Sequence, residues 1–427
     1  MDIQEAIDKS LFFFGAGASY DAQCKLSSGM LDDLRIRIAD KNDTIFNKPE
    51  RDALKFLLSC LEYHSEWRSL ESLGSFKFTP NIEELALLIR RIRNREDFLP
   101  YPITGNWADK LSMLENEFQN LKRSDDGKEN LFESLQYKLK CVLLEEWLEP
   151  KSYDFLEPLK AFFEAYPGHN FRIDIFSLNL DMVLENFFSK NNMRPWRGFV
   201  SGEWRGMDSD DIPDDFGRIN LYKLHGSMDW VRLITGEFKE DKINLSQEDK
   251  DNIESGHDPY VIFGQGTKTF SVEPFFNLIQ HFKRKLLEKN YFFIIGYSFF
   301  DPYINNLLIE AVRETSKRII IVNPFFGPEG LKTNGRIILD GTEFSHIKYP
   351  PGKSELDLAS YIEEIQRNSF YSELPEFNIK RVNAKAIDFI PIETKDFFKT
   401  YFGNGGQTFI NLIAQYEQER INEEEPF

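Results

Sequence analysis

The sequence predicts an α/β fold: a Rossmann-like parallel sheet with helices on both faces and a large inserted helical module. Three observations predict it. Short apolar runs alternate along the chain with helical patterns. These runs lack a regular alternation of apolar and polar residues, which is typical of strands buried on both faces of a parallel sheet. The long stretch between the first run and the second has the periodicity of helices.

The first predicted strand covers residues 11–14 and leads directly into a glycine-containing turn and a predicted helix. Further strands are expected at 172–178, 219–224, 260–263, 291–295 and 318–322. Helices expected at 182–189, 273–288 and 302–314 lie between several of these strands. This order of elements is typical of a parallel α/β sheet.

Two amphipathic stretches, 81–93 and 131–147, predict the inserted module, because each repeats apolar residues on one helical face. We expect residues 1–29 and 166–335 to form the sheet domain and 30–165 to form the helical module. Residues 336–427 would be a C-terminal segment for packing or oligomerisation, with helices near 356–366 and 408–421. The charged stretch 230–259 is expected to form a loop or a small hairpin.

Composition and charge disfavour several classes of protein. The 427 residues carry a formal net charge of −18, which repels phosphate backbones and argues against broad nucleic-acid binding. The three cysteines, Cys24, Cys60 and Cys141, form no CxxC pair and are too few for a four-thiolate zinc site. The first residues lack the apolar core of a signal peptide, and no apolar run is long enough to span a membrane. We expect a cytoplasmic protein.

The turn after the first strand reads Gly15-Ala16-Gly17-Ala18-Ser19. Glycines let a backbone approach a pyrophosphate closely, and a following helix N-terminus presents N–H groups to it. The third glycine of a GxGxxG fingerprint is missing, so a plain tight turn is the alternative.

Polar residues also follow later strands. Asn179 and Asp181 come after the second strand, and His225 follows the third in a His-Gly-Ser sequence. Histidine titrates near neutrality and can act as a general base. Local roles are the alternatives: Asp181 could cap the next helix, Asn179 could stabilise a turn, and His225 could be structural.

A fourth group follows the last two strands: Gly296-Tyr297-Ser298, Asp301-Pro302 and Asn323. Ser298 and Asn323 could bond phosphate or ribose, and ordinary turn chemistry is the alternative. Ligands of open α/β sheets bind beyond the carboxyl ends of the strands. We therefore expect all four groups at one edge of the sheet.

This ordered set resembles the sirtuin, or silent information regulator, family. The sequence at 15–19 is similar to its GAGxS phosphate turn, and 177–181 is similar to its T-x-N-x-D segment. His225 corresponds to its catalytic histidine, 296–298 to its G-T/Y-S turn, and Asn323 to the asparagine of its last strand. The similarity extends over 11–324 but is strong only in these short blocks.

The resemblance implies a role for each matching residue. Asn179 would position the nicotinamide ribose of NAD or a water molecule, and His225 would be the catalytic base. Asp181 would bond the nicotinamide carboxamide. The other residues expected to contact NAD are Gly15, Ala16, Gly17, Ala18 and Ser19 at the pyrophosphate, Gly296, Ser298 and Asn323 at the adenosine half, and Ser227.

Two features depart from protein-deacylating sirtuins. Those enzymes carry a four-cysteine zinc ribbon after the HGS block, whereas residues 228–290 contain no cysteine. The helical module resembles instead the helical elaboration of bacterial sirtuin-like NADases of antiphage defence. Asn81-Ile82-Glu83-Glu84-Leu85 is similar to an N/F-x-E-x-L helix often seen there, with an ordinary amphipathic helix start as the alternative.

The resemblance therefore implies a metal-free NAD⁺ hydrolase that releases nicotinamide and ADP-ribose. It would be a gated effector of antiphage defence through abortive infection, as a homo-oligomer with a partner such as a HerA-type ATPase. Three alternatives remain: a protein deacylase or ADP-ribosyltransferase, a non-catalytic sensor of NAD or ADP-ribose, and a Rossmann oxidoreductase. The last would need an acidic ribose-binding residue about 20 residues after the glycines. Asp32, Asp33 and Asp40 lie near that position.

Overall fold

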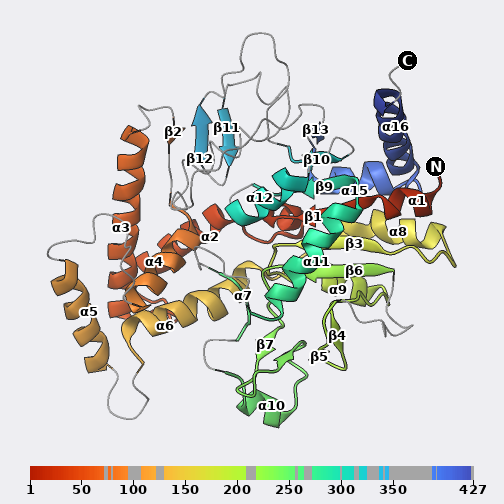
Figure 1. Ribbon diagram of the computed structural model, residues 1–427. Helices are drawn as coiled ribbons and strands as arrows, with labels where there is room; N and C mark the ends of the chain where they lie inside the picture. The colour runs from red at the N-terminus through yellow and green to blue at the C-terminus, as the bar shows by residue number, and fades with distance from the viewer. Residues whose placement is uncertain are drawn as a thin grey trace.

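A computed structural model of the chain describes residues 1–71, 76–77, 80–94, 107–121, 129–207, 218–254, 258–263, 272–298, 301–311, 317–324, 336–339, 342–345, 387–390 and 392–424. A parallel sheet lies beside a group of helices, and other described residues form two smaller antiparallel sheets (Figure 1). The predicted helix at 356–366 lies outside the described residues. None of the helices in the described ranges is long and apolar enough to cross a membrane.

The main sheet has six parallel strands, so the predicted fold class is confirmed. In spatial order they are β13 (Ile387–Ile390), β10 (Arg318–Val322), β9 (Tyr291–Ile295), β1 (Ser10–Phe14), β3 (Ile173–Ser177) and β6 (Ile219–Lys223). When the six strands are numbered by their order in the chain and read across the sheet from β6, they follow the Rossmann order 3-2-1-4-5-6. Its strand order reverses between β1 and β9, where such sheets bind ligands.

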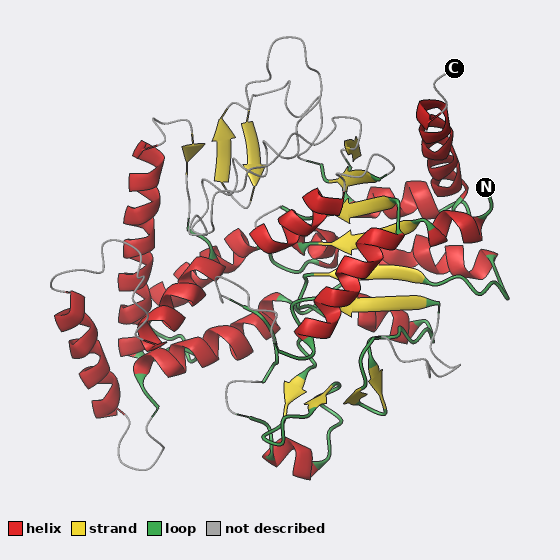
Figure 2. Ribbon diagram, in the orientation of Figure 1, coloured by secondary structure: helices red, strands yellow, loops and turns green. Residues whose placement is uncertain are grey.

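Alternate residues of the strands enter two separate cores, as expected for a sheet covered on both faces. Leu11 and Phe13 of β1 pack with α11 (Phe275–Glu288) and α12 (Pro302–Ala311). Figure 2 shows these two helices crossing one face of the strands. Phe12 and Phe14 face the opposite core, which is built from the helices α1 (Ile3–Asp8), α8 (Glu157–Ala165), α9 (Val183–Lys190), α15 (Thr394–Phe402) and α16 (Gln407–Glu424).

Phenylalanine fills much of the second core. Phe12 stacks on Phe293 with ring centroids 5.2 Å apart, and Phe402 stacks on Phe409 at 5.5 Å. Such pairs stabilise by about 0.5–1.5 kcal/mol beyond the burial of their surface. The abundance of phenylalanine is thus accounted for by the packing of the sheet against its helices.

The structure corrects two sequence-based expectations. Residues 260–263 do not form a strand of the main sheet; Val261 makes one antiparallel bridge with Gly226 instead. The helix expected after the first glycine turn is a 3₁₀ helix, η1 (Ala16–Ala22), and the next α-helix, α2 (Ser27–Ala39), begins later. The sheet also takes β13 from the predicted C-terminal segment, which therefore supplies a strand.

The helical module has a third core of its own. Its elements are α2, α3 (Lys48–Glu71), α4 (Ile82–Asn94), α5 (Trp107–Leu121), α6 (Leu131–Tyr137), a π-helical turn (Lys138–Leu143) and α7 (Leu144–Trp147). Leu180 and Met228, from loops that follow β3 and β6, belong to the same core. The module therefore packs directly on two loops at the carboxyl edge of the main sheet.

Two small sheets complete the described structure. Both are antiparallel. The first, which we call the small sheet, has the order β4 (Phe199–Val200), β5 (Glu203–Trp204), β8 (Phe238–Lys239) and β7 (Val231–Arg232). Its β7–β8 hairpin and the short helix α10 (Gln247–Asp251) occupy the charged stretch 230–259, as expected. The other contains β11 (Arg336–Leu339), β12 (Thr342–Ser345) and β2 (Phe76–Lys77).

Candidate functional site

The loops that leave four parallel strands run side by side at the carboxyl edge of the sheet. Backbone hydrogen bonds continue between them beyond the strand ends. Leu178 donates to Phe14 at 3.0 Å and Leu224 donates to Ser177 at 2.9 Å. On the other side, Gly15 donates to Ile295 at 2.9 Å and Gly296 donates to Val322 at 3.0 Å. The motifs predicted to meet at one edge therefore do so.

The two glycine turns pack against each other at the point where the strand order reverses. The Gly17 N–H donates to the Gly296 carbonyl at 2.8 Å. A Cβ on Gly15 would lie 2.5 Å from the Tyr297 Cα, and one on Gly296, whose φ is +61°, would lie 2.2 Å from the Ala18 nitrogen. These positions require glycine because two backbones are in contact. The Gly17 N–H is consequently engaged inside the protein.

A pocket opens above these turns. Of the predicted residues, six line it: Gly15, Ala16, Asn179, Asp181, His225 and Ser298. The other predicted residues do not line it: Gly17, Ala18, Ser19, Ser227, Gly296 and Asn323. Ser227 is fully buried with its hydroxyl against the Met182 sulfur at 3.1 Å, and the Asn323 N–H donates to the Ile390 carbonyl at 3.2 Å.

Asn179 has an unsatisfied acceptor. Its Nδ2 donates to the Ser19 hydroxyl at 2.9 Å, and its backbone N–H donates to the Ser177 hydroxyl at 3.1 Å. The side-chain Oδ1 is buried, and within the described part of the chain it has no hydrogen-bond donor. A buried polar atom left in this way costs about 1–3 kcal/mol. Because Asn179 lines the pocket, a hydroxyl or water held there would satisfy it.

His225 and Asp301 form a buried pair. His225 Nε2 lies 3.2 Å from Asp301 Oδ2, and the two residues are 5% and 8% exposed. Asp301 Oδ1 accepts the N–H groups of Tyr303 at 3.0 Å and Ile304 at 3.3 Å at the start of α12. Sequence reasoning gave Asp301 no role, although an aspartate directly before Pro302 is a recognisable helix-capping signal.

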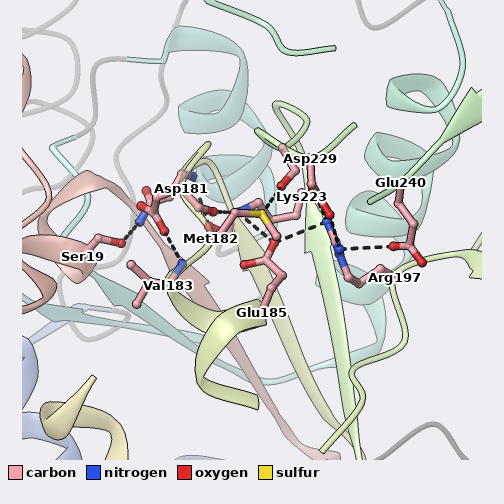
Figure 3. A network of polar contacts seen from close by, with 12 residues as sticks. Ser19, Asp181, Met182, Val183, Glu185, Arg197, Lys223, Asp229 and Glu240 are labelled. Atoms are coloured by element: carbon pink, nitrogen blue, oxygen red, sulfur yellow. Dashed lines mark hydrogen bonds and ion pairs between the residues drawn. The ribbon is translucent and has the colours of Figure 1, made fainter. Parts of the chain in front are cut away.

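Asp181 makes a local hydrogen bond and also lines the pocket. Its Oδ1 accepts the Val183 N–H at 3.0 Å, a local contact to the first residue of α9, although the N-cap position of that helix is occupied by Met182. Its backbone carbonyl accepts a hydrogen bond from Lys223 Nζ at 2.5 Å (Figure 3). The residue nevertheless lines the pocket beside Asn179.

Two other groups of the pocket are held in their protonated forms. Burial raises the pKa of the Cys24 thiol, and the Asp181 carboxylate adds to the effect. Burial also raises the pKa of Tyr297, whose hydroxyl donates to Asn305 Oδ1 at 2.8 Å. A thiol nucleophile needs the thiolate form, so Cys24 is not suited to that role.

The helical module contributes one wall of the same pocket. Asn81, Ile82 and Glu83, at the start of α4, line it, as does Met30 of α2. Asn81 Oδ1 accepts the Glu84 N–H at 2.9 Å, and Glu84 Oε2 accepts the Asn81 N–H at 3.1 Å. This reciprocal pair is the ordinary helix start weighed as the alternative for that motif. The helix start and the pocket wall are therefore the same turn.

The acidic residues considered for the oxidoreductase alternative do not line the pocket. Asp33 accepts a hydrogen bond from Trp147 Nε1 at 3.1 Å and pairs with Lys25. Asp32 pairs with Arg35 at 2.9 Å, and Asp40 follows the last residue of α2. Among the described residues, no group of three or more His, Cys, Asp or Glu side chains is arranged to hold a metal ion.

The pocket and its polar residues can be compared with known proteins. Residues 174–332 match the SIR2-like domain. This match includes Asn179, Asp181 and His225, whereas the turn at 15–19 precedes it. It supports the resemblance to sirtuins that the motifs indicate.

Comparison with curated proteins found no match. A solved structure described as "Structural Basis for the Mechanism and Regulation of Sir2 Enzymes" aligns over 98% of this chain and 99% of that chain. Its sequence identity is 11% and its TM-score is 0.32.

Proposed function

We propose that the protein hydrolyses NAD⁺ at the bond between nicotinamide and ribose, giving nicotinamide and ADP-ribose. The observation that best supports this is that Asn179, Asp181 and His225 share one pocket at the carboxyl edge of a Rossmann-type sheet. The SIR2-like match over the segment that carries them supports the same substrate.

The pocket offers groups for both ends of the substrate. Gly15 and Ala16 line it at the site where Rossmann folds bind pyrophosphate, and Lys25, which pairs with Asp33, lies on the same wall. Asn179 Oδ1 is an acceptor in need of a donor, which a ribose hydroxyl or the attacking water supplies. Ser298, at the turn after β9, adds a hydroxyl to the wall.

The chemistry follows from the bond that breaks. Nicotinamide leaves as a neutral base with the electron pair, so positive charge develops on the ribose. The carboxylates of Asp181 and Asp301 line the pocket and stabilise such charge. A water oxygen bonds to the anomeric carbon, and His225 accepts its proton. Asp301, 3.2 Å from the imidazole, stabilises the histidinium that results.

The fold also fits a gated enzyme. The module supplies Glu83 to the pocket wall and packs on Leu180 and Met228 from the site loops. A shift of the module would therefore move the wall and the loops together. We propose that assembly into a homo-oligomer, or binding of a partner such as a HerA-type ATPase, acts through this contact in antiphage defence.

The test is release of nicotinamide from NAD⁺ by the purified full-length protein, alone and with the candidate partner. We expect Asn179→Ala and His225→Ala to abolish turnover. Asn186→Ala and His169→Ala are matched controls, because Asn186 bonds Tyr153 and His169 is exposed, both outside the pocket wall. Binding of ADP-ribose without any turnover would overturn the proposal in favour of a sensor.

A further inference from the structure

A chain of charged side chains leads away from Asp181, which lines the pocket (Figure 3). Lys223, the last residue of β6, is 2% exposed. Its Nζ donates to the Asp181 carbonyl at 2.5 Å and lies 3.2 Å from Glu185 Oε1. Glu185 belongs to α9, the helix that follows the Asn179–Asp181 loop. Lys223 therefore contacts both that loop and the helix behind it.

The chain continues to the small antiparallel sheet. Arg197 Nη2 lies 3.5 Å from Glu185 Oε1, and the guanidinium makes two 2.8 Å hydrogen bonds to Asp229. Glu240, just beyond β8, lies 3.2 Å from Arg197 Nη1. Burial opposes ionisation of Asp229, but Arg197 outweighs it and lowers the pKa of that carboxyl. Burial raises the pKa of Glu240 despite the same guanidinium.

Such a network is a poor source of net stability. Well-packed apolar side chains often replace a buried ion pair without loss, whereas removing one partner leaves an uncompensated charge. What an apolar replacement cannot supply is the hydrogen bond to the Asp181 carbonyl. The adjacent carbonyl, that of Leu180, is held by the Met228 N–H at 3.0 Å. Two successive carbonyls of the loop are thus fixed, one by the backbone and one by Lys223.

We propose that Lys223 is a positioning residue, which holds the Asn179–Asp181 loop in its reactive geometry and couples it through Glu185 and Arg197 to the small sheet. The coupling rests on the proposed function, because the residues being positioned are those assigned to NAD⁺ hydrolysis. Lys223 lies outside the pocket wall and acts only through the loop. A displacement of about 1 Å in such a loop is enough to lower a rate substantially.

The decisive comparison is between Lys223→Met and the double variant Lys223→Met/Glu185→Leu. Lys223→Met retains the length of the side chain but leaves the buried Glu185 charge dependent on Arg197, which is more distant at 3.5 Å, so both stability and kcat fall. The double variant removes that charge, and Arg197 keeps Asp229 and Glu240 as partners. We expect stability to recover while kcat stays at least about tenfold below the native value. The Ki of nicotinamide should rise.

Lys289→Met is the matched control. Lys289 is also buried, at 6% exposed, and pairs with Asp174 at 3.1 Å, near the amino end of β3. This change should lower stability and leave kcat as it is. Recovery of kcat together with stability in the double Lys223 variant would show a purely structural role and overturn the proposal.

Amide hydrogen exchange separates this inference from the proposed function. In the double variant, we expect faster exchange confined to residues 177–182. Unchanged exchange there would overturn the positioning role whether or not the protein hydrolyses NAD⁺. Absence of turnover in the native protein, with faster exchange in the variant, would overturn only the proposed hydrolysis.

Discussion

Contacts at the strand ends fix individual residues of the pocket and leave one acceptor atom without a donor among the described residues. The Asn179 Nδ2 donates a hydrogen bond to Ser19, whereas its Oδ1 accepts none from the described residues. His225 is oriented by a buried carboxylate. A base held by a third group in this way resembles the arrangement of nucleophile, base and orienting acid in hydrolases. These contacts of Asn179 and His225 support the catalytic roles that we propose for them.

Asp301→Asn tests the orienting role. Asparagine retains the Oδ1 that accepts the Tyr303 and Ile304 N–H groups, so α12 should start normally. The loss of the carboxylate should lower kcat by about 10²-fold or more, because the histidinium is no longer stabilised. Turnover of NAD⁺ and calorimetric binding of ADP-ribose provide the measurement. A kcat within about twofold of the native value would mean that Asp301 only caps the helix.

The residues of the site were predictable to different degrees. Asn179, Asp181 and His225 could be found because each follows an apolar run at a strand end. Asp301 was visible only as a capping aspartate, since nothing in the sequence places it opposite His225. The pairing of Gly17 with Gly296 joins segments far apart in the chain, so its effect on the turn could not be foreseen.

Elements with both faces buried were the most predictable. β9 and β10 have the predicted bounds, because continuous apolar runs mark buried strands. The same signal failed at 260–263, where Tyr260 donates to Trp230 and Ile262 donates to His225 in a loop outside the main sheet. β13 has only four residues, Ile387–Ile390, and the neighbouring sequence did not predict it. It is recognised as a strand by its parallel pairing with β10.

The C-terminal helix α16 is tied to the sheet by a charge, which gives its stability a pH dependence. Burial alone would raise the pKa of Glu417, but hydrogen bonds from Lys9 at 2.8 Å and Tyr291 at 2.6 Å outweigh it and lower the pKa to about 2. A carboxyl whose pKa is depressed on folding contributes stability above its unfolded pKa of about 4.3 and loses it as the pH falls toward 2.

Glu417→Gln should therefore lower the free energy of unfolding at pH 7 and reduce the loss that the native protein shows between about pH 4.5 and pH 2. Urea denaturation at a series of pH values measures both effects. Glu419→Gln is a suitable control on the same helix. Glu419 also forms an ion pair, with Arg318, but its side chain is 41% exposed, compared with 11% for Glu417. Identical pH profiles for the native and Glu417→Gln proteins would contradict the assigned tie.

At the scale of the whole molecule, the main sheet and the helical module share the wall of one pocket. The sheet supplies Asn179, Asp181 and His225, the helical module supplies Glu83, and the small sheet connects to the site loop through Arg197 and Glu185. The sequence predicted the sheet and the module separately. Their meeting at the pocket depends on contacts such as Leu180 against the module core, which no local pattern encodes.

The net charge of −18 makes a further prediction for the proposed reaction. NAD⁺ carries a net negative charge from its pyrophosphate, and the pocket wall holds Glu83, Asp181 and Asp301 against Lys25. Long-range repulsion should therefore slow association at low ionic strength. Salt screens charges beyond about 10 Å at 0.1 M. We expect kcat/KM for NAD⁺ to rise about two- to threefold between 20 mM and 150 mM NaCl.

Nicotinamide riboside gives the matched control, because it keeps the cationic ring and the scissile bond but lacks the pyrophosphate. Its kcat/KM should fall over the same range of salt, since screening weakens attraction instead of repulsion. Stopped assays of nicotinamide release measure both slopes under identical conditions. A fall in kcat/KM for NAD⁺ would contradict the prediction, and it would mean that Lys25 and the backbone turn attract the pyrophosphate more strongly than the rest of the molecule repels it.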